Sequence, residues 1–312
     1  MSVKISLDKD ICIGCGMCFN MCPIGIYRLE EGKAEVVAEN LKECFQDLSC
    51  VRSCPVNAIS LEVLSPYERV VTTGLPKNIT PLKPNIYQIR SYKPGSHIYL
   101  FKGMHKNLLI DSGMEAYYPH LEYSLKQLGL RVDEVHIVVN THEHLDHLGS
   151  NRFFAEKSIL AAHRLAATKI ELQDEYVLHA HRFGLESAMN FKVDLWLDNQ
   201  NLIDLGNYKL VIIHTPGHTS GCICIYEPYQ GMLFTGDTVF AGGILSMILE
   251  SGSVGDYVDS LERLRAMNIR EIYPGHGRIS LEPEKDLKTA IENAKKKLNE
   301  HVKKVKGKTT IS

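Results

Sequence analysis

The sequence predicts two units of different fold class. A small cysteine-rich unit of short strands and turns comes first, and a larger α/β unit follows, in which helices cover layers of sheet. Three observations support this division. Seven of the nine cysteines precede residue 55, prolines punctuate the next stretch, and from residue 85 strand-like segments alternate with helical patterns. With 312 residues, of which 44% are hydrophobic, the chain can bury more than one core.

The expected boundaries follow from these changes in composition. Residues 1–62 form the cysteine-rich unit, residues 63–84 form a linker, and residues 85–312 form the second unit. Little periodicity is present in the linker, which contains Pro66, Pro76, Pro81 and Pro84.

Strands of the second unit are expected where β-branched and apolar residues form short runs bounded by turn residues. In chain order these runs are 86–90, 97–101, 107–111, 135–139, 159–163, 209–214, 222–226, 233–237 and 271–277. Apolar residues at helical spacing predict helices at 121–129 and 256–268. The lysine-rich end also has an apolar stripe, which predicts an amphipathic helix with its lysines in solvent. The stripe consists of Leu287, Ile291, Ala294, Leu298, Val302 and Val305.

The charge balance gives no reason to expect nucleic acid or an anionic membrane as the main partner. The formal net charge is -2 and the isoelectric point is near 6.7. The first residues, MSVKISLDKDIC, lack the apolar core of a secretion signal, and no apolar run reaches membrane-spanning length. We therefore expect a cytoplasmic protein that acts on a small-molecule substrate. A redox partner protein and a homo-oligomer stay open as further partners.

Two cysteine motifs dominate the first unit. The first has the spacing C-x2-C-x2-C-x3-C-P and consists of Cys12, Cys15, Cys18, Cys22 and Pro23. Three thiolates at this spacing hold one iron–sulfur cluster, and the fourth reaches a different cluster. The second copy consists of Cys44, Cys50, Cys54 and Pro55, with Asp47 where a cysteine is missing. A zinc knuckle would leave these interlocked motifs unexplained.

About sixty residues therefore resemble the bacterial dicluster ferredoxins. The resemblance implies an α+β ferredoxin-like domain in which one 4Fe-4S cluster is held by Cys12, Cys15, Cys18 and Cys54. It also implies a second cluster surrounded by Cys22, Cys44, Asp47 and Cys50. Because a carboxylate is a harder ligand than a thiolate, its iron is more easily lost. We expect the second cluster to be either 4Fe-4S with Asp47 as a ligand or 3Fe-4S.

Histidine and aspartate are concentrated in THEHLDHLG, residues 141–149, directly after an apolar run. Three later strand-like segments lead into TPGHT, FTGDT and YPGHG. The candidate ligands are His142, His144, Asp146, His147, His218, Asp237 and His276. Sheets of α/β proteins collect ligands at the carboxyl ends of their strands, so these side chains are expected to meet around two metal ions. Glycines next to the ligands fit tight turns that would aim the ligand side chains inward. They are Gly217, Gly236, Gly275 and Gly277.

This ordered set is similar to that of the metallo-β-lactamase superfamily, over about residues 85–305. The resemblance implies an αββα sandwich with two zinc or iron ions, which would lower the pKa of a shared water molecule. By that match one ion is bound by His142, His144 and His218, and the second by Asp146, His147 and His276. Asp237 bridges the two ions, and Asp146 and Asp237 are the expected catalytic residues.

Several other residues are expected to have packing or surface roles rather than ligand roles. His163, His179 and His181 lie in or beside the stretch that shapes the substrate pocket in this family, so contact with substrate is the alternative for them. Core positions are expected for Cys222, Cys224 and Trp196.

Three functions fit these parts. Hydrolysis of a small acyl thioester, ester or lactone, with redox input or regulation from the clusters, is favoured by histidine at position 144, where flavin-linked diiron reductases usually have glutamate. GHTSGCICIY and LFTGDTVF also resemble glyoxalase-type thioesterases. The alternative is a diiron oxidoreductase that reduces dioxygen, nitric oxide or a peroxide, because the fused clusters would keep an electron donor at high effective concentration. The third is a redox sensor.

Overall fold

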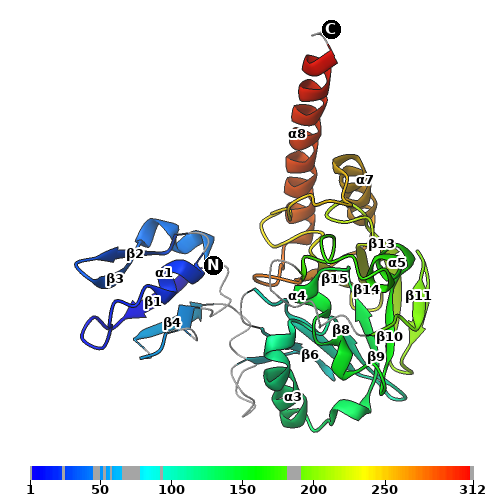
Figure 1. The fold of residues 1–312 in the computed structure, drawn as a ribbon, viewed down its shortest axis with the longest axis horizontal. Helices are drawn as coiled ribbons and strands as arrows, with labels where there is room; N and C mark the ends of the chain where they lie inside the picture. The colour runs from blue at the N-terminus through cyan, green and yellow to red at the C-terminus, as the bar shows by residue number, and fades with distance from the viewer. Residues whose placement is uncertain are drawn as a thin grey trace.

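The computed structural model describes residues 2–22, 25–44, 50–51, 54–56, 58–64, 78–91, 94–180 and 191–309. Within these ranges the chain forms a small N-terminal part, blue in Figure 1, and a larger sandwich of two sheets. None of the helices in these ranges combines the length and the apolar character needed to cross a membrane.

The N-terminal part contains two antiparallel strand pairs. β1 (Ser2–Leu7) pairs with β4 (Ile59–Leu64), so the first and last strands of this part lie together. β2 (Tyr27–Glu30) pairs with β3 (Lys33–Val36) through a tight turn with positive φ at both central residues, which matches the twist of a hairpin. The helical elements are α1 (Met17–Met21) and η1 (Ala38–Glu43). β4 extends to residue 64, two residues past the predicted boundary at residue 62.

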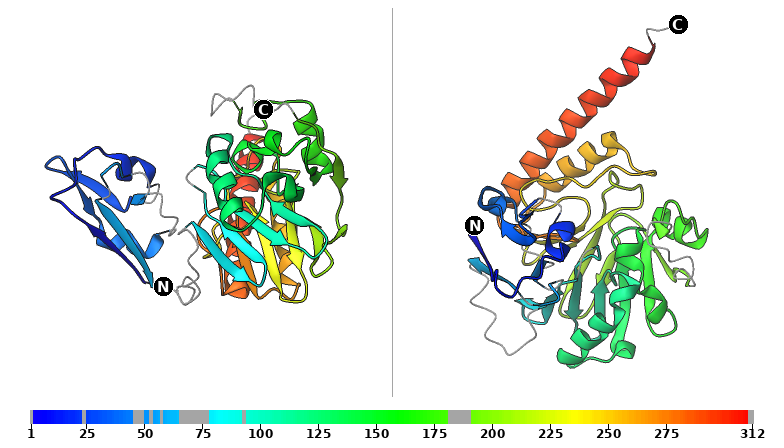
Figure 2. Two further views of the ribbon diagram at one scale, coloured as in Figure 1. Left: turned by 90° about the horizontal axis from the view of Figure 1, so that it is seen from below. Right: turned by 60° about the vertical axis from the view of Figure 1, so that its left-hand side comes forward.

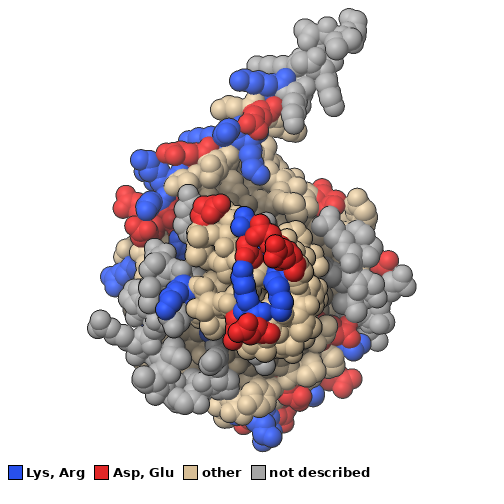
Figure 3. Space-filling view, turned by 90° about the vertical axis from the view of Figure 1, so that its left-hand side faces the viewer, with Lys and Arg blue, Asp and Glu red and all other residues tan. Residues whose placement is uncertain are grey.

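Charged side chains of opposite sign are paired on the β2–β3 hairpin. Its register places Arg28 opposite Glu35, with Nη2 of the arginine 3.1 Å from Oε2 of the glutamate, and Lys9 contacts the same carboxylate. On the face of the molecule in Figure 3, basic and acidic side chains lie next to one another. This hairpin therefore presents no field of a single sign.

The first sheet of the sandwich has seven strands in the order β11-β10-β9-β8-β7-β6-β5. The strands from β8 to β11 are parallel and the remainder pair antiparallel. Their bounds are β5 (Ile79–Lys83), β6 (Ile86–Ile89), β7 (Ile98–Lys102), β8 (Asn107–Ile110), β9 (Val135–Asn140), β10 (Ile159–His163) and β11 (Leu195–Leu197).

Both edges of this sheet differ from the sequence expectation. β5 lies inside the stretch that was predicted as linker, and it contains Pro81. An edge strand tolerates proline because one side of the strand needs no backbone N–H donor. At the opposite edge, Trp196 of β11 is 47% exposed, so the prediction that it belongs to the core is wrong.

The second sheet has five strands in the order β12-β13-β14-β15-β16. β12 to β15 pair antiparallel, and β15 and β16 are parallel, so β13, β15 and β16 all end at the same edge. Their bounds are β12 (Leu202–Asp204), β13 (Lys209–His214), β14 (Ile223–Glu227), β15 (Met232–Gly236) and β16 (Glu271–Pro274).

Three apolar layers hold the sandwich together, one between the sheets and one under the helices on each outer face. Figure 2 shows the sheets and the flanking helices from two sides. Ile137 and Val139 of β9 pack in the layer between the two sheets, whereas Val138 packs against the helices on the outer face of the first sheet. This alternation is what a strand with both faces buried requires. The outer faces are covered by α3 (Tyr118–Gln127) and α5 (Arg164–Glu171) on the first sheet, and by α7 (Val254–Arg265) and α8 (Pro283–Thr309) on the second. The predicted αββα sandwich is confirmed.

Short helices fill the connections, and one long helix ends the described chain. The short helices are η3 (Glu115–Tyr117), η4 (Val132–Glu134), α4 (Leu145–Leu148) and η5 (Asn151–Phe153). α8 is the predicted amphipathic helix: Leu287, Ile291 and Ala294 are buried against the second sheet and α7. Farther along, α8 extends away from the sandwich in Figure 1, and Val302 is 40% exposed. The side chain of Val305 lies outside the described residues.

Candidate functional site

The candidate ligands meet where strands of the two sheets end. The segment after β9, which includes α4, contains four of them, and one follows each of β13, β15 and β16. The antiparallel and parallel pairings bring the last three strand ends to one edge of the second sheet. All seven residues therefore reach a common site from four separate segments.

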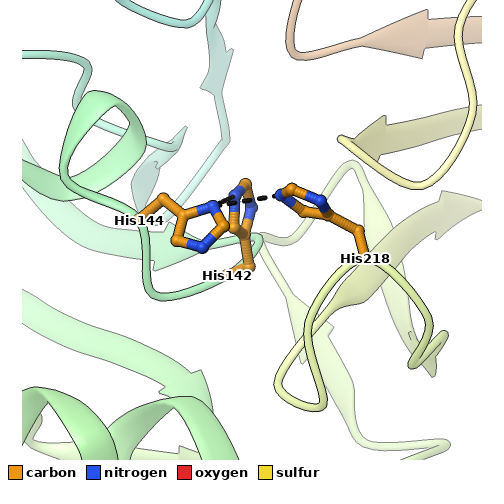
Figure 4. A group of neighbouring side chains, drawn as sticks. All are labelled: His142, His144 and His218. Atoms are coloured by element: carbon orange, nitrogen blue, oxygen red, sulfur yellow. Dashed lines mark hydrogen bonds between the residues drawn. The ribbon is translucent and has the colours of Figure 1, made fainter. Parts of the chain in front are cut away.

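The first ligand group consists of three buried histidines (Figure 4). Nδ1 of His144 lies 3.0 Å from Nε2 of His142 and 3.0 Å from Nε2 of His218. Burial lowers the pKa of both His142 and His144 well below the ordinary value. These rings are therefore neutral near pH 7, and their converging nitrogens can donate lone pairs to one cation.

The second ligand group consists of Asp146, His147 and His276. Oδ2 of Asp146 lies 3.1 Å from Nε2 of His276 and 3.6 Å from Nε2 of His147. Although burial opposes it, three nearby carboxylates raise the pKa of His147 above its ordinary value. Two imidazoles and one carboxylate at these distances form a second set of ligands next to the first.

Asp237 lies between the two groups. Its Oδ1 is 3.3 Å from Nε2 of His147 and 3.6 Å from Nε2 of His276, while its Oδ2 is 3.7 Å from Nε2 of His218. Each carboxylate oxygen thus faces a different ligand group. This is the geometry expected of a bridging ligand.

The unpaired atoms of the site indicate what it is built to hold. Nε2 of His147 and Oδ1 of Asp237 are buried and have no hydrogen-bond partner among the described residues. Leaving polar atoms buried without partners is costly, unless they bind an ion. Because both atoms point toward other ligand atoms, the residues fit two divalent cations.

Partners behind the ligands orient the imidazole rings, and Asp111 is the main one. Its Oδ2 lies 2.8 Å from Nδ1 of His147, and it also accepts hydrogen bonds from the backbone and hydroxyl of Thr141. The backbone carbonyl of Met247 contacts Nδ1 of His218 in the same way. Asp111 was not recognised from the sequence as part of the site, although it follows β8, the strand beside β9.

Two of the predicted turn glycines are required by close contacts. Gly236 has φ +48°, and a Cβ there would lie 2.5 Å from Oγ1 of Thr141. A Cβ on Gly275 would lie 2.6 Å from Cε1 of His147. Side chains at these positions would displace the ligand loops, so the glycines permit the strand ends to approach each other.

A separate cavity in the N-terminal part is lined by four cysteines. They are the set expected to hold the first cluster: Cys12, Cys15, Cys18 and Cys54. Backbone N–H groups of Ala34 and Gly14 lower the pKa of Cys12, and the N–H of Ala58 donates to Sγ of Cys54 at 3.2 Å. Backbone donors therefore reach two of the four sulfurs, and four cysteines around one cavity fit the ligand set of an iron–sulfur cluster.

The remaining cysteines lie against the same small core. Cys50 is buried there beside Tyr27, and Cys22 and Cys44 pack on it in half-buried positions. Asp47, the expected fourth ligand of the second cluster, lies outside the described residues.

The other singled-out histidines have different surroundings. The ring of His179 stacks on His144, with centroids 4.4 Å apart, and its Nε2 lies 3.1 Å from Oε2 of Glu250. It therefore packs against the first ligand group, and contact with substrate stays the alternative role for it. His163 instead stacks on His214, and His181 lies outside the described residues. Cys222 and Cys224 are buried, as expected for packing residues.

A separate family model matches each of the two parts of the chain. Residues 93–276 match the family described as the metallo-beta-lactamase superfamily, and residues 4–55 match the 4Fe-4S dicluster domain. A probable metallo-hydrolase of Methanocaldococcus jannaschii is 32% identical over 202 residues, which are 62% of this chain and 93% of that protein. The acyl-coenzyme A thioesterase MBLAC2 of Homo sapiens is 30% identical over 214 residues, which are 61% of this chain and 76% of the thioesterase.

Solved structures show the same fold at lower sequence identity. A metallo-beta-lactamase family protein from Thermus thermophilus superposes with a TM-score of 0.61 at 21% identity, covering 70% of this chain and 82% of that chain. A subclass B3 metallo-beta-lactamase of Bradyrhizobium japonicum superposes with a TM-score of 0.57 at 22% identity, covering 75% and 97%.

Proposed function

Because the chain belongs to the metallo-beta-lactamase superfamily and begins with a 4Fe-4S dicluster domain, we propose that it is a metal-dependent hydrolase. The proposed substrate is a small acyl thioester or a related ester or lactone. The dicluster domain supplies redox input or regulation.

The observation that carries this proposal is the composition of the first ligand group. It consists of three histidines, with His144 at the position where the flavin-linked diiron reductases usually have glutamate. A neutral imidazole leaves more positive charge on a bound cation than a carboxylate does, which favours activation of water. The relatives agree with hydrolysis, since they include a probable metallo-hydrolase and acyl-coenzyme A thioesterases.

Two divalent ions bound by the two groups would supply an activated water molecule and polarise the carbonyl group of the substrate. The chain's own residues hold the ligands in place for this chemistry. The hydroxyl of Tyr257 donates to the backbone carbonyls of Asp237 at 3.1 Å and Thr238 at 2.6 Å. Oγ of Ser246 lies 3.4 Å from Oδ2 of Asp237. These contacts fix the bridging carboxylate between the two groups.

Metal analysis and turnover assays test the proposal together. Full-length protein purified without oxygen should contain zinc in the sandwich domain and should release thiol from acyl-coenzyme A thioesters without an electron donor. Antiferromagnetically coupled iron in that domain, with no hydrolysis of thioesters or lactones, would contradict it.

A diiron oxidoreductase is the second candidate, and the attached dicluster domain is the observation that favours it. Imidazole and carboxylate ligands accept iron as well as zinc. An enzyme of this type would reduce dioxygen, nitric oxide or a peroxide only when a reductant is present. Reductant-driven oxygen consumption by the iron-loaded protein therefore separates the two candidates.

A further inference from the structure

In the sequence, Glu143 lies between His142 and His144, two ligands of the first group. Its side chain is fully buried, and it takes part in a polar network instead of the ligand group. Its Oε1 accepts hydrogen bonds from Nζ of Lys169 at 2.5 Å and from Oγ of Ser251 at 3.2 Å. Its Oε2 accepts from Oγ1 of Thr219 at 3.0 Å. Nζ of Lys169 also donates to Oγ of Ser220 at 2.6 Å and to Oγ of Ser251 at 3.0 Å. We refer to Glu143, which is fully buried, and Lys169, whose side chain is 18% exposed, as the buried pair.

The buried pair connects four segments of the chain. Glu143 belongs to the ligand loop after β9, and Lys169 lies in the last turn of α5. Thr219 and Ser220 directly follow the ligand His218, and Ser251 belongs to the segment that precedes α7. Two ligand-bearing loops are therefore tied to the same two charged groups.

Close packing leaves these loops little freedom around the pair. A Cβ on Gly221 would overlap Oε2 of Glu143 and would lie 2.7 Å from Cβ of Ala166 on α5. Any drift of the carboxylate would thus be transmitted to the loop that carries His218.

The segment around Ser251 also holds His218 directly. The carbonyl of Met247 contacts Nδ1 of His218, and the N–H of Leu249 donates to the carbonyl of His218 at 3.1 Å. The N–H of Ser253 donates to the carbonyl of Gly217 at 3.0 Å. Because Ser251 bonds to both members of the buried pair, the position of this segment depends on the pair.

We propose that the buried pair is a positioning device for the first ligand group, which sets the spacing of His142, His144 and His218. In the described part of the chain, the hydrogen bonds of the pair reach Thr219, Ser220 and Ser251, and none reaches the second ligand group. Loss of the pair should therefore weaken the first metal site selectively. This inference rests on the metal centre in the proposed function, but not on the identity of the substrate.

The test is release of zinc from the full-length protein with its clusters in place, titrated with a chelator in the absence of oxygen. His276→Ala, which removes a ligand of the second group, identifies which release step belongs to which site. Glu143→Gln and Lys169→Met should each weaken the first site by about 10- to 100-fold and leave the second site unchanged. In the double variant Glu143→Gln/Lys169→Met, the loss of zinc affinity at the first site should be smaller than the two single losses combined. The reason is that no unpaired buried charge remains.

A matched control comes from another partly buried ion pair, in which Nζ of Lys83 lies 3.1 Å from Oε2 of Glu271. Lys83→Met should lower the stability of the fold and leave the zinc affinity of the first site unchanged. If the charge variants fail to fold, Ser251→Ala tests the proposal instead. This variant removes one hydrogen bond from each member of the pair and leaves the two charges paired with each other. It should weaken the first site by a few-fold.

Unchanged affinity of the first site in the folded variants would overturn the proposal. An equal loss at both sites, or the same loss in Lys83→Met, would also overturn it, since the pair would then act on stability alone. Zinc affinity is measured without substrate. Absence of hydrolysis would therefore count against the proposed function and leave this inference standing.

Discussion

Among single residues, His144 differs from the other two histidines of its group in the nitrogen that it presents. His142 and His218 offer Nε2, and their Nδ1 atoms contact Thr141 and the carbonyl of Met247. His144 directly precedes α4, and it presents Nδ1, the ring nitrogen nearer to the backbone. The backbone at this residue therefore contributes directly to the position of Nδ1.

Replacing His144 by alanine should remove metal from the first site and lower hydrolysis by about 100-fold or more. Metal content and thiol release are the measurements. His163→Ala is the control, because His163 stacks on His214 rather than on a ligand, and it should keep both properties. Turnover at the original rate with full metal occupancy in His144→Ala would show that the ligand is misassigned.

Asp47→Cys tests the second cluster. Cysteine restores the missing motif position, so the variant should hold two all-thiolate 4Fe-4S clusters. Electron paramagnetic resonance of the unaltered protein should instead show either carboxylate-ligated 4Fe-4S or a 3Fe-4S signal. Two ordinary cubane signals in both proteins would contradict this prediction.

The site residues that could be predicted from the sequence are those that occur together in short motifs. His142, His144 and His147 stand within six positions of one another, so their shared purpose is visible without a structure. Asp111 is one acid at the end of a strand, and Lys169 lies 26 positions from Glu143. Their partners are set by sheet pairing and helix docking, which no local pattern records.

Secondary structure elements were predictable where they were long enough to show periodicity. β9, β10 and β13 begin and end within a residue of the expected strands. β11 and β12 have three residues each, which is too short for an alternating pattern to be recognised. Pro81 of β5 and the prolines around it indicated a linker, because a sequence alone does not show which strand will lie at an edge.

Gly236→Ala should destabilise the junction between β15 and the ligand loop. A residue with a side chain at positive φ costs about 1–2 kcal/mol, and the contact with Thr141 should add about 1–3 kcal/mol. Gly129→Ala is the matched control, since Gly129 has φ +73° and no described atom lies within 4 Å of the place that a Cβ would take. Chemical denaturation should show a larger loss for Gly236→Ala, and equal losses would contradict the close contact.

For the molecule as a whole, the question is what the attached dicluster domain does for the sandwich domain. Hydrolysis transfers no electrons, so turnover should survive damage to a cluster. Cys15→Ser removes one of the four cysteines that line the cluster cavity. We expect altered electron paramagnetic resonance signals, unchanged zinc content, and thiol release that is changed in rate but retained. Complete loss of thiol release in this variant would contradict the prediction that the clusters modulate hydrolysis without being required for it.

The order in which the ligands occur along the chain has a consequence for biosynthesis. His144 and His218 are 74 positions apart, and Asp146 and His276 are 130 positions apart. A nascent chain can thus gather the three histidines before β16 has left the ribosome, whereas the second ligand group must wait until His276 has emerged as well. Contacts of such long range form late, so the second ion should be acquired after the first.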